Sequence, residues 1–212
     1  MQNKASVLMH SRSDLEGIVF VMTIDQRGSR RGPDLVESVL GDLAGRRGVV
    51  RAFERTAGDE IQGLLDDATV VVDLALRLAR DQAWSIGIGA GGVRQPVPKS
   101  VRAGSGPAFE HARTAVERAK AAGPHLAVEG EDAKRAREAG DLLAALASIV
   151  QRRSAAGWEV VDLLAQGLTQ REAASRLGIT AQAVNQRART AWWHHEQDLR
   201  PLAARLLSEA RS

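Results

Sequence analysis

Residues 168–190 constrain the fold most, because they carry the signals of two short helices joined by a tight turn. Thr169 followed by Glu172 forms a capping box, in which each side chain bonds the backbone N–H of the other residue at a helix start. Gly178 stands where the chain must reverse, a position that favours a left-handed backbone. Thr180 can cap the next helix. We therefore expect two helices separated by a turn at Gly178.

The second of these helices has a polar outer face without carboxylates. Val184, Ala188 and Ala191 form its inner apolar stripe. Gln and Asn side chains can pair with adenine, and Arg can pair with guanine or contact phosphate. The residues that we expect to contact double-stranded DNA are Thr180, Gln182, Asn185, Gln186, Arg187 and Arg189, with Arg187 on phosphate. An ordinary helical hairpin with solvated Gln and Arg side chains is the alternative.

Three runs carry a resemblance in this region: Leu168-Thr-Gln-Arg-Glu, Arg176-Leu-Gly-Ile-Thr and Val184-Asn-Gln-Arg. Through them the segment resembles the promoter-reading fourth region of sigma factors and the DNA-binding module of LuxR-type regulators. The resemblance implies a helix-turn-helix whose second helix enters the major groove. Because one such module covers few base pairs, we expect a homodimer that reads two half-sites. Trp192 and Trp193 are expected to anchor the second helix to the domain core.

Composition limits the classes of protein to which this chain can belong. Its 212 residues suffice for two domains, and its net charge of +3 does not by itself indicate nucleic-acid binding. The sequence has no cysteine, which excludes disulfides, thiolate zinc sites and a cysteine nucleophile. It shows no signal peptide and no apolar run long enough to cross a bilayer. We therefore expect a cytoplasmic protein without a membrane partner.

The order of β-prone and amphipathic segments predicts the fold class. Strands are expected at 17–24, 49–53, 61–65, 84–89 and 125–128, and helices at 34–44, 67–80, 107–119 and 131–153. This order predicts an α+β fold, with a ferredoxin-like or palm-type sheet domain covered by helices and a small all-α helix-turn-helix domain. The expected parts are a tail at 1–16, the sheet domain at 17–130, a connecting helix at 131–155 and the helix-turn-helix domain at 156–212.

The glycine-rich run Gly87-Ile-Gly-Ala-Gly-Gly92 formally matches a dinucleotide-binding loop. Residues 93–98 follow it with two prolines and no helical pattern, so the required strand–turn–helix context is missing. We expect these glycines to permit the close approach of a ligand or of a neighbouring strand.

Acidic residues gather at one predicted end of the sheet. Asp25 ends the first strand, and Asp59 and Glu60 lie at the hairpin turn on a neighbouring strand. Magnesium in proteins often uses one or two carboxylates together with substrate phosphates. Asp25 and Asp59 are therefore candidate Mg²⁺ ligands. The alternative is that these acidic residues are present only because acids are common at turns.

Four runs stand in order along the sheet domain: Thr23-Ile-Asp-Gln-Arg-Gly-Ser-Arg30, Thr56-Ala-Gly-Asp-Glu-Ile-Gln-Gly63, Ile86-Gly-Ile-Gly89 and Gly104-Ser-Gly-Pro-Ala-Phe-Glu-His-Ala-Arg113. In these runs the chain resembles the SatD family and, more distantly, the palm of class III nucleotide cyclases. The resemblance implies a nucleotide ligand with Mg²⁺ bound by Asp25 and Asp59. The expected ligand or phosphate contacts are Ser29, Arg30, Glu60 and Arg113.

One position departs from the cyclase pattern. Those cyclases carry an Asn four residues before the phosphate-binding Arg, and Phe109 stands there in this chain. We therefore expect a transcriptional regulator that senses a nucleotide or a related phosphorylated ligand, since ligand binding can bias an attached element without catalysis. The alternatives are an active metal-dependent nucleotidyl cyclase or nucleotide hydrolase localised by its helix-turn-helix, and a repressor whose first domain only dimerises.

Overall fold

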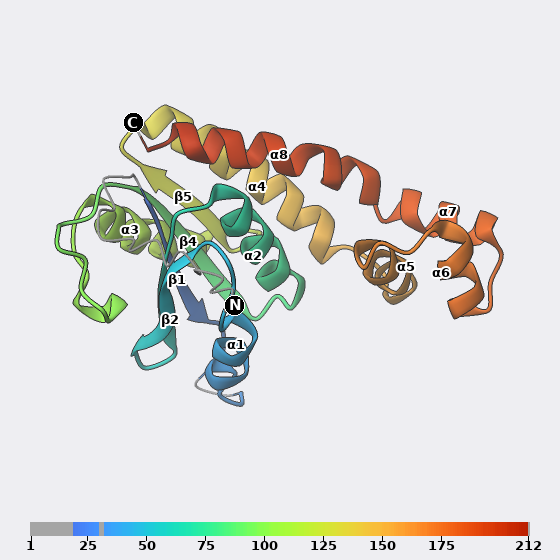
Figure 1. Cartoon of the computed structure of the whole chain (residues 1–212), viewed down its shortest axis with the longest axis horizontal. Coiled ribbons are helices and arrows are strands. Elements are labelled where there is room, and N and C mark those ends of the chain that lie inside the picture. Colours follow the sequence, from blue (N-terminus) through green and yellow to red (C-terminus); the bar gives the residue numbers. More distant parts are fainter. Residues whose placement is uncertain (1–18, 30–31, 212) are drawn as a thin grey trace, which may run out of the picture.

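The structure, a computed structural model, describes residues 19–29 and 32–211. Within these residues the chain has the expected α+β fold, with a five-stranded mixed sheet and eight α-helices (Figure 1). None of the helices described there is long and apolar enough to cross a membrane. The elements in chain order are β1 (Val19–Gln26), α1 (Val36–Leu43), β2 (Val49–Ala57), β3 (Glu60–Leu65), α2 (Ala68–Arg80), β4 (Trp84–Gly91), the 3₁₀ helix η1 (Val101–Ala103), α3 (Pro107–Ala121), β5 (Leu126–Gly130), α4 (Ala133–Gln151), α5 (Ala155–Ala165), α6 (Gln170–Leu177), α7 (Ala181–Thr190) and α8 (Trp193–Glu209).

The sheet has the strand order β2-β3-β1-β4-β5. β4 and β5 run parallel, whereas the other neighbouring strands are antiparallel. The expected hairpin is confirmed as β2 and β3, and Gly58 in its turn has a positive φ of 56°. Because β1 pairs with β3 on one side and with β4 on the other, its end lies beside the β2–β3 turn. The acidic residues of these two segments are therefore neighbours.

Side chains of β1 alternate between two cores, as the two-residue period of a strand requires. Phe20, Met22 and Ile24 enter a core formed with helices α2, α4 and α8. Val19 and Val21 face the opposite side, where they pack with η1 and α3. β1 is therefore buried on both faces, as expected from its continuous apolar run.

Gly87 and Gly89 of β4 permit a helix to pack against the strand backbone. A Cβ atom on Gly89 would lie 2.1 Å from the carbonyl oxygen of Ala108, and one on Gly87 would lie 2.3 Å from the backbone nitrogen of Val116. The close approach expected at these glycines is confirmed. However, α3 makes this approach, rather than the ligand or neighbouring strand that the sequence suggested.

The last helix joins the two ends of the molecule. α8 runs antiparallel to α4, from the region of α5, α6 and α7 back to the sheet (Figure 1). The backbone N–H of Asp132, at the start of α4, donates to the carbonyl of Ala210 at 3.3 Å. Ala203 and Leu207 are buried in the core shared by α2, α4 and the sheet. Residues after 192 thus contribute to the sheet core, although the expected boundary at 156 placed them with the all-α part.

Candidate functional site

Local hydrogen bonds fix the turn between α6 and α7. The backbone N–H of Thr169 donates to Glu172 Oε2 at 2.7 Å, and Thr169 Oγ1 accepts from the N–H of Glu172, so the predicted capping box is present. These bonds from Thr169 lower the pKa of the Glu172 carboxyl. Gly178 has a φ of 65°, and Thr180 Oγ1 accepts from the N–H of Ala183 at 3.1 Å. The two-helix geometry predicted from sequence is therefore formed.

Helix α7 presents the residues that we expected at base edges. Val184 and Ala188 are buried against α5 and α6. The side chains on the outer face of α7, all exposed, are Gln182, Asn185, Gln186 and Arg189. In Figure 1 this helix lies at the end of the molecule far from the sheet. The outer face is thus both polar and accessible to a large partner.

Arg187 differs from its neighbours on α7. Its Nη1 lies 3.0 Å from Glu159 Oε2 on α5, and both side chains are partly exposed. A pair of this kind contributes little to stability and can be exchanged for another anion. The sequence predicted Arg187 as a phosphate contact but gave no sign of this carboxylate partner.

At the other end of the molecule, Asp25 lies in a cluster of carboxylates. It stands opposite Glu60 in the β1–β3 register. Burial raises the pKa of the Asp25 carboxyl, Lys120 opposes this rise, and the charges of Asp59 and Glu60 add to it. Lys120 Nζ of α3 lies 3.3 Å from Asp25 Oδ2. An ammonium group therefore already neutralises the carboxylate that was expected to hold Mg²⁺, and a metal ion at Asp25 would displace it.

Glu60 and Arg113 line one cavity of about 410 Å³ between the sheet and α3. Thr56 Oγ1 donates to Glu60 Oε1 at 2.6 Å, which fixes this carboxylate. The other residues that line the cavity are Gln62, Arg102, Gly104, Ser105, Gly106, Phe109 and Glu110. Two arginines and two glutamates, one of them held by Thr56, thus share a space of the size of a small ligand. The sequence did not single out Arg102.

The start of α3 borders this cavity but offers few free donors. Pro107 has no N–H, the N–H of Ala108 donates to Gly92, and that of Phe109 donates to Gly106, both at 3.0 Å. A phosphate in the cavity would therefore depend on arginine side chains. The ring of Phe109 packs so closely on the loop that a Cβ on Gly104 would lie 2.2 Å from it.

The predicted ligand residues do not all meet. Ser29, Asp25 and Asp59 are not among the residues that line the cavity, and Arg30 lies outside the described residues. In the described ranges no group of three or more His, Cys, Asp or Glu side chains is placed to hold a metal ion. A Mg²⁺ site with Asp25 and Asp59 as its protein ligands would therefore need further oxygen ligands, such as those of a bound phosphate.

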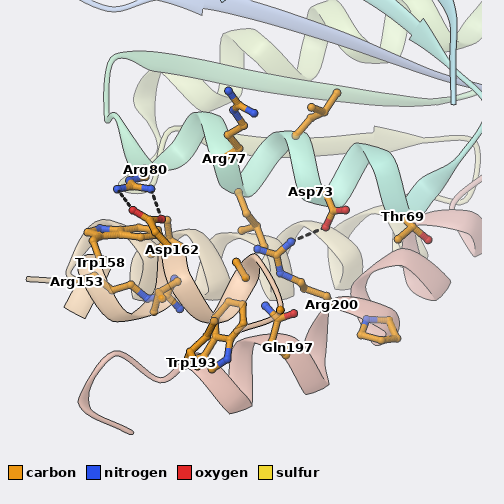
Figure 2. Close-up of a pocket in the computed structure, with 18 of the residues that line it drawn as sticks. Thr69, Asp73, Arg77, Arg80, Arg153, Trp158, Asp162, Trp193, Gln197 and Arg200 are labelled. Atoms are coloured by element: carbon orange, nitrogen blue, oxygen red, sulfur yellow. Dashed lines mark hydrogen bonds and ion pairs between the residues drawn. The ribbon is translucent and has the colours of Figure 1, made fainter. Parts of the chain in front are cut away.

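A cavity of about 870 Å³ lies where α2 faces α5 and α8 (Figure 2). Arg80 of α2 donates to both oxygens of Asp162 on α5, at 2.7 and 2.9 Å. The guanidinium of Arg80 also lies 3.8 Å from the ring centre of Trp158. On the other side, Arg200 of α8 pairs with Asp73 of α2 at 2.5 Å. Ion pairs thus bridge the sheet part and the helical part across this cavity.

A buried ion pair adjoins the same cavity. Arg153, just after α4, pairs with Glu196 of α8, and both side chains are almost completely buried. Glu196 also accepts from Arg200. Arg153 Nε donates to the carbonyl of Ala191, at the end of α7, at 2.8 Å. The network therefore links α4, α8 and the end of α7.

Trp192 and Trp193 have different environments. Trp193 packs against the small core of α5, α6 and α7, as expected for an anchor. Trp192 is 54% exposed, so its predicted role as an anchor is wrong.

The chain matches no protein-family model, no curated protein and no solved structure.

Proposed function

We propose that the chain is a DNA-binding transcriptional regulator of the cytoplasm whose sheet domain senses a nucleotide or a related phosphorylated ligand. The observation that carries the proposal is the outer face of α7, with exposed Gln182, Asn185, Gln186 and Arg189 and no carboxylate along the helix. Amide side chains at helical spacing suit the donor and acceptor pattern of adenine, and Arg suits that of guanine. In this proposal α6 and α7 form a helix-turn-helix, with α7 in the major groove.

Phosphate contacts would fix the position of α7 on the duplex. Arg187 can exchange Glu159 for a phosphate, because the pair is partly exposed. Arg171 and Arg176 of α6 are also exposed. A single recognition helix contacts few base pairs, so two copies on adjacent half-sites would supply the specificity.

The sheet domain is proposed as the sensor because it combines a suitable topology with a cavity that two arginines line. The chain order β1-α1-β2-β3-α2-β4 is that of a ferredoxin-like unit, which supports the palm-type assignment. In the cavity, Arg102 and Arg113 can bind phosphate oxygens, and Glu60, held by Thr56, can accept from sugar hydroxyl groups. Asp25, now paired with Lys120, and Asp59 would be the residues to hold a Mg²⁺ ion, which would supply positive charge to a bound phosphate.

Fluorescence anisotropy with labelled genomic fragments tests the DNA function. We expect a saturable rise in anisotropy at low ionic strength. Comparison of the fragments should then identify a preferred DNA site. On that site Arg189→Ala should lose about 1–3 kcal/mol of binding free energy, with relaxed discrimination at one position. Arg187→Ala should weaken binding to all DNA sequences alike and reduce the slope of log K against log salt concentration by about one.

Arg205→Ala is the matched control, since it removes the same charge from the exposed far half of α8. It should leave both affinity and selectivity unchanged. If the wild-type protein shows no binding to any duplex at low salt, the proposed function is wrong.

A further inference from the structure

Trp192 connects α7 to α8 in a backbone conformation that bulky residues rarely adopt. Its φ of 56° lies in the left-handed region, which favours Gly or Asn. Within the described residues it is the one large apolar side chain that is exposed, at 54%. The left-handed backbone therefore does not favour a tryptophan here, and more than half of the side chain stays outside the core; such an outlier points to a function.

The surroundings of Trp192 continue the face of α7. Its ring centre lies 5.1 Å from that of His195. Both side chains line a shallow hollow of about 310 Å³ together with His194 and with Gln186 and Arg189 of α7. No carboxylate is among the residues that line this hollow, as far as the structure describes the chain. The polar and basic surface of α7 thus extends past the end of the helix.

We infer that Trp192 and His195 extend the DNA interface onto the sugar–phosphate backbone of the duplex; this inference rests on the proposed function of α7. The indole offers an apolar face to a deoxyribose ring and an Nε1–H donor to a phosphate oxygen. The imidazole of His195 supplies a further N–H donor. Contacts of this kind add affinity and fix orientation, and they do not read sequence. The strained turn at Trp192 serves to aim the indole at the DNA.

Replacement by glycine separates this function from folding. Trp192→Gly removes the ring and also removes the strain of a side chain in the left-handed backbone region. The melting temperature should therefore stay the same or rise. The dissociation constant for duplex DNA should increase at least about five-fold on every sequence, since the loss of one net-favourable hydrogen bond corresponds to about that factor. The slope of log K against log salt should not change, because the indole replaces no counterion. Anisotropy titrations over a salt series and thermal melts supply these values.

Trp192→Asn provides a second variant, since Asn also tolerates the left-handed region and lacks the ring. Unchanged affinity in both variants, with wild-type DNA binding intact, overturns this inference and leaves the proposed function standing. Absence of DNA binding by the wild type overturns both. Light scattering supplies the remaining outcome: if the variants become monomers where the wild type is a dimer, Trp192 contacts a second copy instead of DNA, and the inference is wrong.

Discussion

At the scale of single residues, two arginines of α7 illustrate how neighbours in sequence differ in role. Arg187 is paired with Glu159, whereas Arg189 is exposed on the outer face. Helical periodicity predicted which side of α7 each side chain occupies. It could not predict the pairing, because Glu159 lies on α5, 28 residues earlier in the chain. If α7 binds DNA as proposed, Arg187 would exchange Glu159 for a phosphate, whereas Arg189 would reach the base edges without giving up a partner.

Asp25 gives a prediction about pH. Its carboxyl has a raised pKa, chiefly from burial, with Asp59 and Glu60 adding to the rise that Lys120 opposes. The folded state then holds the proton more tightly than the unfolded chain, so this group favours folding at low pH and opposes it once pH exceeds the raised pKa. Asp25→Asn should therefore raise the melting temperature near neutral pH. The gain should shrink as pH falls through the raised pKa toward the ordinary value of an aspartate.

Asp34→Asn is the control, because the pKa of the Asp34 carboxyl is shifted in the opposite direction. Hydrogen bonds from Arg55 and from the backbone of Val36 lower the pKa of Asp34, so its charged form favours folding. This variant should not gain stability at neutral pH. Melting curves of both variants and the wild type, recorded from about pH 4 to about pH 8, make the comparison. A melting temperature of Asp25→Asn at or below that of the wild type across the range contradicts the account of the cluster.

At the scale of secondary-structure elements, the contact of α3 with β4 positions the cavity that holds Arg113. Gly89→Ala would force a Cβ to within 2.1 Å of the Ala108 carbonyl, and backbone atoms cannot move aside cheaply. We expect a loss of about 1–3 kcal/mol in unfolding free energy, or more if α3 is displaced. Urea denaturation gives the value.

The matched control for this prediction is Gly41→Ala. Gly41 lies inside α1, and a Cβ there would meet no atom within 4 Å. Because alanine suits a helix better than glycine, this variant should gain about 0.5–1 kcal/mol. Equal stability of the two variants would show that α3 does not pack on β4 as described.

The elements that sequence predicted well are those whose signals are local. The capping box at Thr169, the glycine turn at Gly178 and the buried run of β1 each depend on residues within one element. The glycines of β4 were recognised as sites of close approach, but their partner α3 was not, since it follows at some distance in the chain. The return of α8 to the sheet was missed for the same reason. Its buried residues Ala203 and Leu207 find their partners on distant helices.

At the scale of the whole molecule, charged side chains tie the proposed DNA-reading part to the proposed sensor. Arg80 and Asp162 join α2 to α5, and Arg153 joins the end of α4 to α8 and to the carbonyl of Ala191, which follows α7. A change in the sheet part that moves α2 or α4 would therefore reach α7 through contacts already present. Sequence gave no sign of this network, because paired residues such as Arg153 and Glu196 lie 43 positions apart.

The buried pair offers the test of this coupling. Glu196→Gln keeps the shape of the side chain but leaves Arg153 charged, buried and without its ionised partner. Breaking such a pair on one side costs about 3 kcal/mol or more, which urea denaturation should detect. Asp73→Asn is the control, because its pair with Arg200 is half exposed and should cost about 1 kcal/mol or less. Hydrogen exchange should show the amides of α7 and α8 losing more protection than those of β1 in Glu196→Gln. A uniform loss of exchange protection across the molecule would mean that the Arg153–Glu196 pair supports the fold without holding α7 in place.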